Sequence, residues 1–324
     1  MKKRRKGIKL YYEFDIDLEI KSARCLSKTN SELLKYLNYG DFFTLIKEAS
    51  VTNELRNEYL TETLKDNFSG VVIDCVDDQP FDLSNTATLF NYENMVLEGG
   101  DIIASALGIN DKRICLVKNF RTAEFFKRGF ENYKLMKVGV KYPIKSQVEK
   151  YATANKLLRL SPQTCRAVYR ASVFREAQTT RIITVWGNAV SLPAILEAPI
   201  GLPVKDLLEQ CGAFGVIERV VRGGVLTGKL IGADTVISPF DTSVTALTEK
   251  SHRSTKDCIN CGRCTEVCPK GLAPYYILRR GNIFGVNKNY LESFKFCDRC
   301  SCCAYVCPSK QPLSALIDAY VSFD

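Results

Sequence analysis

Alternation of apolar and polar residues marks the first patterned segment of the chain. Four apolar residues alternate with acidic residues between positions 12 and 20: Phe14, Ile16, Leu18 and Ile20. A period of two residues is typical of a strand with one buried face. Residues 31–66 have apolar positions at helical spacing instead, and we expect Gly40 to divide this stretch into two helices.

Short apolar strands then alternate with helical segments. The pattern predicts strands at residues 70–74, 113–117 and 134–140, and helices at residues 94–107 and 122–130. Such alternation is typical of an α/β domain built on a parallel sheet.

The pattern changes near residue 180. A β-rich run at 181–187 precedes a segment punctuated by proline and glycine, a short helix at 204–210, and a strand at 219–222 that runs into a turn. This predicts a small, separate α+β unit. A polar linker at 248–257 leads to a cysteine-rich end. We expect four parts: an N-terminal segment (1–40), an α/β domain (41–178), an α+β domain (179–247) and a cysteine-rich domain (248–324).

Cysteine usage narrows the chemistry. The chain of 324 residues has 14 cysteines, nine of them between Cys258 and Cys307, and a single histidine, His252. In a cytosolic protein, such clustering indicates metal binding more often than disulfides. One histidine excludes multi-histidine zinc sites and argues against a Ser-His-Asp catalytic triad.

Two cysteine runs share the spacing C-x2-C-x2-C-x3-C-P, which is the spacing of bacterial ferredoxins with two [4Fe–4S] clusters. In such ferredoxins the fourth cysteine of each run binds the other cluster. We therefore assign one cluster to Cys258, Cys261, Cys264 and Cys307. The other is assigned to Cys268, Cys297, Cys300 and Cys303. Cys302 lies outside the motif as a small packed residue, with a slip in register left open.

Helical segments connect the two runs. Residues 275–280, 291–296 and 313–320 fit helices, which indicates an α-helical ferredoxin-like domain in place of a compact β-rich one.

Net charge and hydropathy bear on location and partners. The formal net charge is +9, and much of it lies in the first nine residues. This basic start is either a solvated terminus or a contact with anionic lipid at the periphery of a membrane. We expect no nucleic-acid binding, because no recognition motif accompanies it. No apolar signal-peptide core follows, and no apolar run is long enough for a transmembrane helix, so we expect a cytoplasmic protein.

The cysteine runs, with residues 258–264 and 300–310 as they stand, resemble RnfC, the peripheral subunit of the Rnf electron-transport complex. That family is related to the flavin-bearing 51 kDa subunit of respiratory complex I. Residues 185–190 and 198–204 resemble its soluble-ligand-binding β-grasp (SLBB) domain, and residues 72–80 resemble the acidic loop of its α/β domain. The resemblance implies a multidomain α/β plus α+β fold: a Rossmann-like complex I 51 kDa-type α/β domain, a β-grasp SLBB domain and an α-helical ferredoxin-like domain.

The sequence departs from this family where a flavin would bind. The family's glycine-rich loop corresponds to about residues 50–63, which contain no glycine, and its Gly-Gly-Glu element is replaced after Tyr142-Pro143. An asparagine of the family is Ser161 here. We therefore expect a degenerate site for FMN and NADH, lost or badly weakened. Asp74 and Asp77 align with the family's nucleotide loop. They are cofactor-binding residues by this resemblance, or else ordinary strand-end and turn carboxylates.

The resemblance implies an RnfC-like electron-transfer protein. It would relay electrons through two [4Fe–4S] clusters, without its own FMN, between protein redox partners such as a ferredoxin, a flavoprotein or a reductase. Two alternatives remain open. One is a flavin-dependent NADH oxidoreductase, and the other is a scaffold or assembly protein in which the clusters hold the fold.

Overall fold

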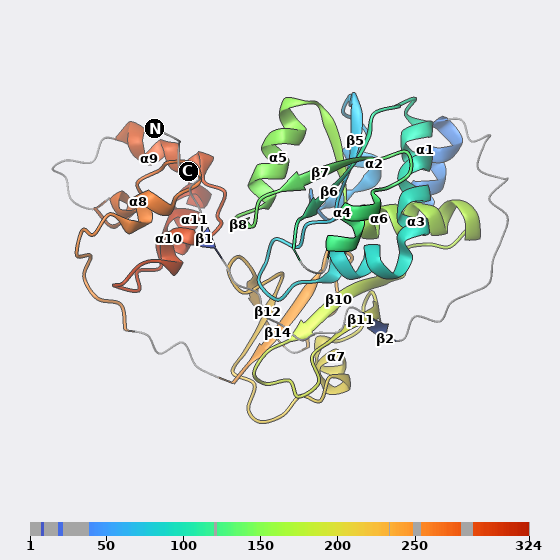
Figure 1. Ribbon diagram of the computed structural model, residues 1–324. Coiled ribbons are helices and arrows are strands. Elements are labelled where there is room, and N and C mark those ends of the chain that lie inside the picture. Colours follow the sequence, from blue (N-terminus) through green and yellow to red (C-terminus); the bar gives the residue numbers. More distant parts are fainter. Residues whose placement is uncertain are drawn as a thin grey trace.

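The computed structural model describes residues 8–9, 19–21, 39–119, 122–232, 234–248, 254–279 and 288–323. Three groups of elements lie side by side (Figure 1). An α/β body carries a β-grasp sheet below it in this view, and a helical C-terminal lobe lies beside both. No helix in the described part of the chain combines the length and the apolar character needed to cross a bilayer.

A four-stranded parallel sheet forms the centre of the α/β body, in the order β7-β6-β5-β9. Its strands are β5 (Gly70–Asp74), β6 (Lys112–Val117), β7 (Lys134–Val138) and β9 (Leu157–Leu160). Side chains alternate between the two faces of β5: Val71 and Ile73 enter the main core, while Val72 enters a second core on the other face. Both faces are therefore covered, as a parallel sheet requires.

Helices cover the two faces of this sheet unequally. The main core contains side chains of α1 (Tyr39–Glu48), α2 (Leu60–Thr63), α3 (Ser84–Ala106), α4 (Ala123–Arg128) and α6 (Pro162–Tyr169). The second core is formed with α5 (Lys145–Ala154). A π-helical turn, Arg170–Phe174, follows α6. Small strand pairs complete the body: β3 (Thr52–Asn53) with β4 (Glu58–Tyr59), and β1 (Ile8–Lys9) with β8 (Lys141–Tyr142).

Helix α3 packs closely on α6 through one glycine. A Cβ atom at Gly99 would lie 1.9 Å from the carbonyl oxygen of Cys165, so only glycine lets the two backbones approach this closely. The glycine pair at 99–100 therefore lies inside a continuous helical segment.

The second sheet has six strands in the order β13-β12-β14-β10-β11-β2. They are β2 (Ile20–Lys21), β10 (Thr180–Trp186), β11 (Ala194–Pro199), β12 (Arg219–Arg222), β13 (Lys229–Ile231) and β14 (Ser243–Leu247). The central pair β10–β14 is parallel; β11 runs antiparallel to β10, and β12 runs antiparallel to β14. With α7 (Val204–Gln210) packed on the core of this sheet, the arrangement is a β-grasp.

The C-terminal lobe consists of short helical pieces around a small core. They are α8 (Arg263–Val267), a 3₁₀ turn (Pro274–Arg279), α9 (Lys288–Glu292), a second 3₁₀ turn (Ser293–Phe296), α10 (Cys302–Tyr305) and α11 (Leu313–Phe323). Phe294, Leu313 and Ile317 are almost fully buried at its centre, together with several cysteines. The described residues that connect the two cysteine runs are therefore largely helical.

The expected elements differ from the structure at several places, and the elements between Lys141 and Phe174 were not expected at all. The helix expected over 94–107 corresponds to the second part of α3, which follows a break in the helix at Tyr92 (φ −130°, ψ 32°); the first part, from Ser84, is not among the expected elements. The helical stretch expected over 31–66 is wrong at 52–59, which form the β3–β4 hairpin, and Gly40 lies in the first turn of α1. Most of the strand expected over 12–20 and the helix before residue 39 lie outside the described residues, as does His252.

Candidate iron–sulfur and cofactor sites

The eight motif cysteines surround two separate cavities in the C-terminal lobe. The first, here called the outer cavity, has a volume of about 270 Å³. Its walls contain Cys258, Cys261, Cys264 and Cys307. These are the four cysteines that the sequence assigns to one cluster, three from the first motif and one from the second.

The second cavity, here called the inner cavity, is much narrower, at about 20 Å³. Its walls contain Cys268, Cys297, Cys300 and Cys303, together with Cys302. The fourth member of this set again comes from the other motif. Four thiols around one space are the donor set of a [4Fe–4S] cluster, so both sets fit that group by their chemistry.

The two motifs wrap their cysteines with the same backbone pattern. The second residue after the first cysteine, Asn260 or Arg299, has a positive φ, and so has the fourth, Gly262 or Ser301. A positive φ is unusual for residues other than glycine. Its repetition at equivalent places in both motifs indicates a functional constraint on the loop. Among the described residues, no three His, Cys, Asp or Glu side chains are arranged to hold a single metal ion.

The two sets differ in exposure. Cys258 and Cys261 are exposed, whereas Cys268 and Cys303 are buried. Burial raises the pKa of the Cys303 thiol to about 12, and it also raises the pKa of Cys264 and of Cys297. Metal binding at these buried thiols therefore has to displace protons.

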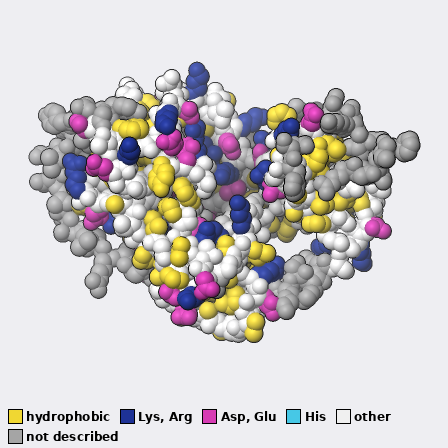
Figure 2. Space-filling view, turned by 180° about the vertical axis from the view of Figure 1, so that it is seen from behind, with side chains coloured by type: hydrophobic (Ala, Val, Ile, Leu, Met, Phe, Trp, Pro, Cys, Tyr) yellow, Lys and Arg dark blue, Asp and Glu magenta, His cyan; other side chains and the backbone are white. Residues whose placement is uncertain are grey.

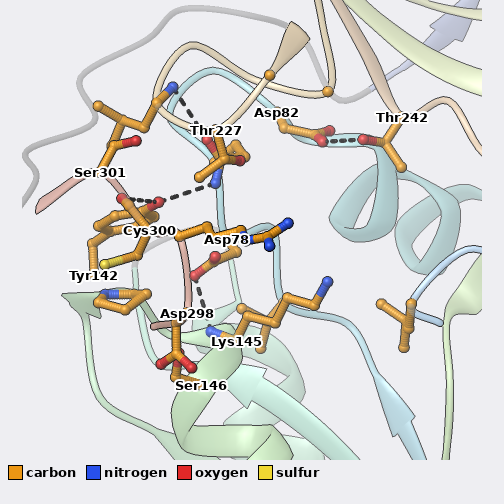
Figure 3. A pocket seen from close by; sticks show the side chains of 18 of the residues that line it. Asp78, Asp82, Tyr142, Lys145, Ser146, Thr227, Thr242, Asp298, Cys300 and Ser301 are labelled. Carbon is orange, nitrogen blue, oxygen red and sulfur yellow. Dashed lines mark hydrogen bonds between the residues drawn. The ribbon is translucent and has the colours of Figure 1, made fainter. Parts of the chain in front are cut away.

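Hydrogen bonds tie the inner motif to the α/β body. The Tyr142 hydroxyl donates to the Cys300 carbonyl at 2.8 Å. Gln79 donates through Nε2 to the Tyr142 oxygen at 3.2 Å, and its Oε1 accepts from the backbone N–H of Leu226 at 3.3 Å. This chain of contacts joins the β-grasp loop, the acidic loop of the body and the second cysteine motif (Figure 3).

A second contact lies next to the first. The Ser146 hydroxyl donates to Asp298 at 2.7 Å, and Lys270 forms an ion pair with the same carboxylate at 2.9 Å. The lobe is therefore held against the body at the residues next to Cys297 and Cys300. The sequence patterns do not reveal the roles of Tyr142, Gln79 and Ser146, since nothing local marks a contact between distant segments.

A larger cavity of about 820 Å³ lies between the body, the β-grasp loop and the lobe. Figure 2 shows a hollow between the two lobes of the molecule, with basic and acidic side chains around it. Cys297 and Cys300 border both this central cavity and the inner cavity. The acidic loop, with Asp74, Asp77 and Asp78, forms part of its wall.

The carboxylates of the acidic loop already have partners. Asp74 is paired with Arg159 at 2.6 Å. Asp77 accepts hydrogen bonds from the backbone N–H groups of Asn85 and Thr86, at the start of α3. Burial and the neighbouring Asp82 raise the pKa of Asp77 to about 8. The contacts of Asp74 and Asp77 are those of strand-end and turn carboxylates, and a cofactor-binding role for them stays a prediction.

The acidic loop also binds backbone amides at the start of a second helix that borders this cavity, α5. Asp78 accepts hydrogen bonds from the backbone N–H groups of Ile144 and Lys145, at 2.6 and 2.9 Å, at the start of α5. Free amides at a helix start are the usual anchor of a phosphate. Here the protein's own carboxylates take amides at the starts of both α3 and α5.

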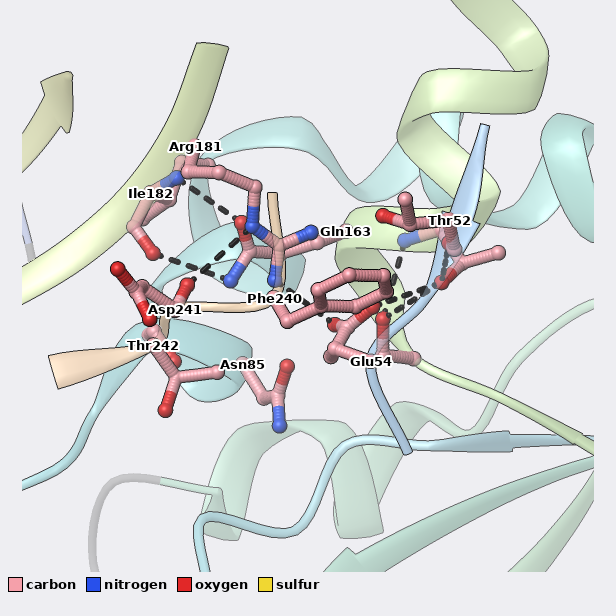
Figure 4. Close-up of polar contacts among 12 residues, drawn as sticks. Thr52, Glu54, Asn85, Gln163, Arg181, Ile182, Phe240, Asp241 and Thr242 are labelled. Atoms are coloured by element: carbon pink, nitrogen blue, oxygen red, sulfur yellow. Dashed lines mark hydrogen bonds and ion pairs between the residues drawn. The ribbon is translucent and has the colours of Figure 1, made fainter. Parts of the chain in front are cut away.

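The glycine-free segment 50–63 contains a buried carboxylate that also has partners within the protein. Glu54, whose side chain is almost fully buried, forms an ion pair with Arg181 at 3.3 Å and accepts a hydrogen bond from Thr164 at 3.0 Å (Figure 4). Burial opposes ionisation of Glu54, but Arg181 and hydrogen bonds outweigh it and hold the pKa of the carboxyl below its ordinary value. A negative side chain thus stands where the related family has a glycine-rich loop. The amides that Asp77 and Asp78 bind at the two helix starts are therefore not free for an FMN phosphate.

Comparison with known proteins gives the chain its relatives. A family model described as SLBB domain matches residues 182–232, and one described as 4Fe-4S binding domain matches residues 253–272. The RnfC component of the ion-translocating oxidoreductase complex of Rhodobacter capsulatus is 34% identical over 132 residues, which cover 39% of this chain and 25% of that protein. Its counterpart in Buchnera aphidicola is 26% identical over 268 residues, covering 75% of this chain and 56% of that protein.

A third relative, the corresponding protein of Serratia proteamaculans, is 28% identical over 63% of this chain and 32% of its own length. The chain thus matches between a quarter and just over half of the length of these relatives. Among solved structures, the NAD⁺-reducing [NiFe]-hydrogenase in the air-oxidized state aligns with a TM-score of 0.59 at 11% identity, over 88% of this chain and 66% of that one.

The H2-reduced state of the same kind of hydrogenase aligns with a TM-score of 0.52, also at 11% identity, over 64% of this chain and 47% of that one. At this identity the structural likeness shows the fold alone, and it confirms the multidomain α/β plus α+β architecture expected from the sequence. The chain is therefore a homologue of RnfC, a component of the ion-translocating oxidoreductase complex, with an SLBB domain and a 4Fe-4S binding domain.

Proposed function

We propose that the protein is an electron-transfer subunit that holds two [4Fe–4S] clusters, one in the outer and one in the inner cavity, and has no flavin of its own. The observation that carries this proposal is the crossed lining of the two cavities. Each contains three cysteines of one motif and the fourth cysteine of the other. A cluster held there supplies one-electron chemistry, and the protein supplies its position and surroundings.

The chain's own residues would arrange the two clusters as consecutive steps of an electron relay. Cys268 and Cys307 each cross from one motif to the cavity of the other, so the two motifs cannot move apart without losing a ligand. Tyr142 and Ser146 hold the inner motif against the body. Cys258 and Cys261 leave the outer set open to solvent. This supports a relay whose outer end is exposed to solvent and whose inner end borders the central cavity.

The absence of FMN is supported by the walls of the central cavity. Amides at the starts of α3 and α5 are bound by Asp77 and Asp78, and Glu54 occupies the glycine-free segment. We propose protein redox partners on separate grounds, because relatives of the chain are named as parts of an oxidoreductase complex. A cytoplasmic location is supported by the thirteen described cysteines, none of which forms a disulfide.

Oxygen-free purification of the full chain tests the proposal. We expect about eight irons and eight sulfides per chain, the content of two such clusters, and no flavin absorbance after incubation with FMN. Reversible reduction by dithionite should be visible in the electron paramagnetic resonance spectrum. Iron far below this content, or zinc in its place, would overturn the proposal. Bound FMN with NADH-dependent bleaching would establish a flavin-dependent NADH oxidoreductase instead, and clusters that resist reversible reduction would establish a scaffold.

A further inference from the structure

The mouth of the outer cavity is where motif cysteines themselves are exposed. Cys258 and Cys261 are exposed there, and the side chain between them belongs to Ile259, which is 66% exposed. None of the inner-set cysteines is exposed: Cys268 and Cys303 are buried, while Cys297 and Cys300, which border the central cavity, are half-buried. A protein that docks at the outer mouth therefore lies directly against two motif cysteines.

Three basic residues lie within two positions of residues that line this mouth. Lys256 and Lys310 belong to neighbouring segments, because the Lys256 N–H donates to the carbonyl of Ser309 at 3.0 Å and Gln311 donates to the Lys256 carbonyl at 2.6 Å. Arg263 follows Cys261 by two residues, at the start of α8. All three are exposed, and within the described part of the chain none of them has a carboxylate partner within 4 Å.

Carboxylates near the mouth are fewer. Asp257 and Glu266 are the exposed acids of the described segment 254–268. By contrast, basic residues closer to the body are neutralised: Lys270 pairs with Asp298 at 2.9 Å, and Arg299 pairs with Asp318 at 2.9 Å. The outer mouth thus has three cations without an ion-pair partner among the described residues, close in sequence to residues of its wall, one of which is the exposed Ile259. A polar, charged rim around an apolar centre is typical of a transient docking surface.

We propose that the mouth of the outer cavity, with Ile259 in its wall and Lys256, Arg263 and Lys310 next to it in sequence, is the docking surface for a small electron-carrier protein with an acidic face around its redox centre. The inference rests on the proposed function and adds to it the face and the chemistry of the partner. Opposite charges steer the carrier to the lobe, and Ile259 provides the apolar contact at the centre. The carrier docks away from the central cavity, since that side of the lobe is covered by the body.

Binding of a small acidic plant-type [2Fe–2S] ferredoxin to the full, anaerobically purified chain tests the proposal. The triple variant Lys256→Glu/Arg263→Glu/Lys310→Glu should weaken binding about tenfold or more at low ionic strength, where steering by charge is least screened. Lys47→Glu makes the same kind of charge change on α1, remote from the lobe, and should bind as the unmodified chain does. A basic c-type cytochrome should bind the unmodified chain far more weakly than the ferredoxin.

The milder variant Lys256→Gln/Lys310→Gln keeps the cysteine motifs untouched, in case charge reversal disturbs the cluster. It should bind more weakly than the unmodified chain and lose much of the salt dependence. Equal affinity of this variant and the unmodified chain would overturn the proposal. So would tighter binding of the cytochrome, self-association through this face, or a changed cluster potential with unchanged affinity, since the last would mean that the cations only balance the charge of the cluster.

Iron content and reduction by dithionite are measured first on the same samples. Full iron with no ferredoxin binding would sink the docking surface and leave the proposed function standing. Missing iron would sink the proposed function itself.

Discussion

The hydroxyl of Tyr142 donates a hydrogen bond to the backbone carbonyl of Cys300 at 2.8 Å, across 158 positions of sequence. Tyr142 is almost fully buried, and its oxygen also accepts from Gln79. The contact thus directs the positive end of an O–H dipole toward the loop that carries two cysteines of the inner set. Hydrogen bonds and nearby charge are among the factors that set the reduction potential of an iron–sulfur cluster.

Tyr142→Phe removes this dipole and keeps the ring. The reduced cluster carries more negative charge, so the variant should have a lower reduction potential at one of its two clusters and an unchanged potential at the other. Its folded state should also lose about 1 kcal/mol, the usual net value of one hydrogen bond. Redox titration followed by electron paramagnetic resonance measures the shift. Tyr151→Phe, which loses a hydrogen bond to Arg113 on the body, is the matched control. Equal potentials in both variants would show that the contact has only a structural role.

Cys302 and Cys303 are neighbours in the wall of the inner cavity, but only Cys303 belongs to the motif. Cys302→Ala should therefore retain about eight irons per chain, while Cys303→Ser should keep about four, the content of one cluster. Iron analysis of oxygen-free preparations distinguishes the two. The reverse result would mean that the register of the motif is shifted by one residue.

Crossed ligation predicts which cluster each proline-linked cysteine supports. Cys307→Ser should disturb the exposed outer cluster, and Cys268→Ser the inner cluster beside Tyr142. In Tyr142→Phe combined with Cys268→Ser, the remaining cluster should have the potential it has in Cys268→Ser alone. If the Tyr142 substitution still shifts that potential, each motif holds its own cluster and the crossed assignment is wrong.

Glu197 joins the β-grasp sheet to the body and should make stability depend on acid. Its carboxylate contacts Arg166 at 2.8 Å and Arg170 at 3.2 Å, and it accepts a hydrogen bond from Thr180 at 2.6 Å. Burial opposes ionisation, but Arg166 and Thr180 outweigh it and hold the pKa of Glu197 below its ordinary value. Because this pKa is lower in the folded state than in the unfolded state, where it is about 4.3, the ionised carboxylate stabilises the fold above that pH. This stability is lost as the pH falls toward the pKa of the folded state.

Glu197→Gln should lower the free energy of unfolding at pH 7 by about 3 kcal/mol, because it leaves buried arginine charge uncompensated. The Glu197 carboxyl titrates between about pH 5 and pH 3, so over that range the variant should lose less stability than the unmodified chain does. Urea unfolding followed by fluorescence of Trp186, the single tryptophan, measures both effects. Glu62→Gln, from an exposed pair with Lys65, should change little. Parallel pH profiles of Glu197→Gln and the unmodified chain would contradict the assignment.

Local patterns account for what the sequence predicted. The apolar run of β5 and the helix α7 depend on neighbouring residues, and they appear as expected. The first part of α3, before the break at Tyr92, was missed because Ser84 and Asn85 look like loop residues, although both are buried in the fold. The Tyr142 bridge was missed for a related reason: it depends on three segments that meet only after folding. The cysteine spacing, by contrast, is a local signal and names all eight motif residues that line the two cavities.

The close packing of α6 on Gly99 also affects contacts outside the core of the body. From this one helix, Thr164 reaches Glu54 at the edge of the glycine-free segment, while Arg166 reaches Glu197 in the β-grasp sheet. Even a single extra methyl group at position 99 would act as a wedge under α6, because the first atom it meets is rigid backbone. The displacement of α6 would disturb both of these contacts at once. The α/β body and the β-grasp sheet therefore both depend on glycine at position 99.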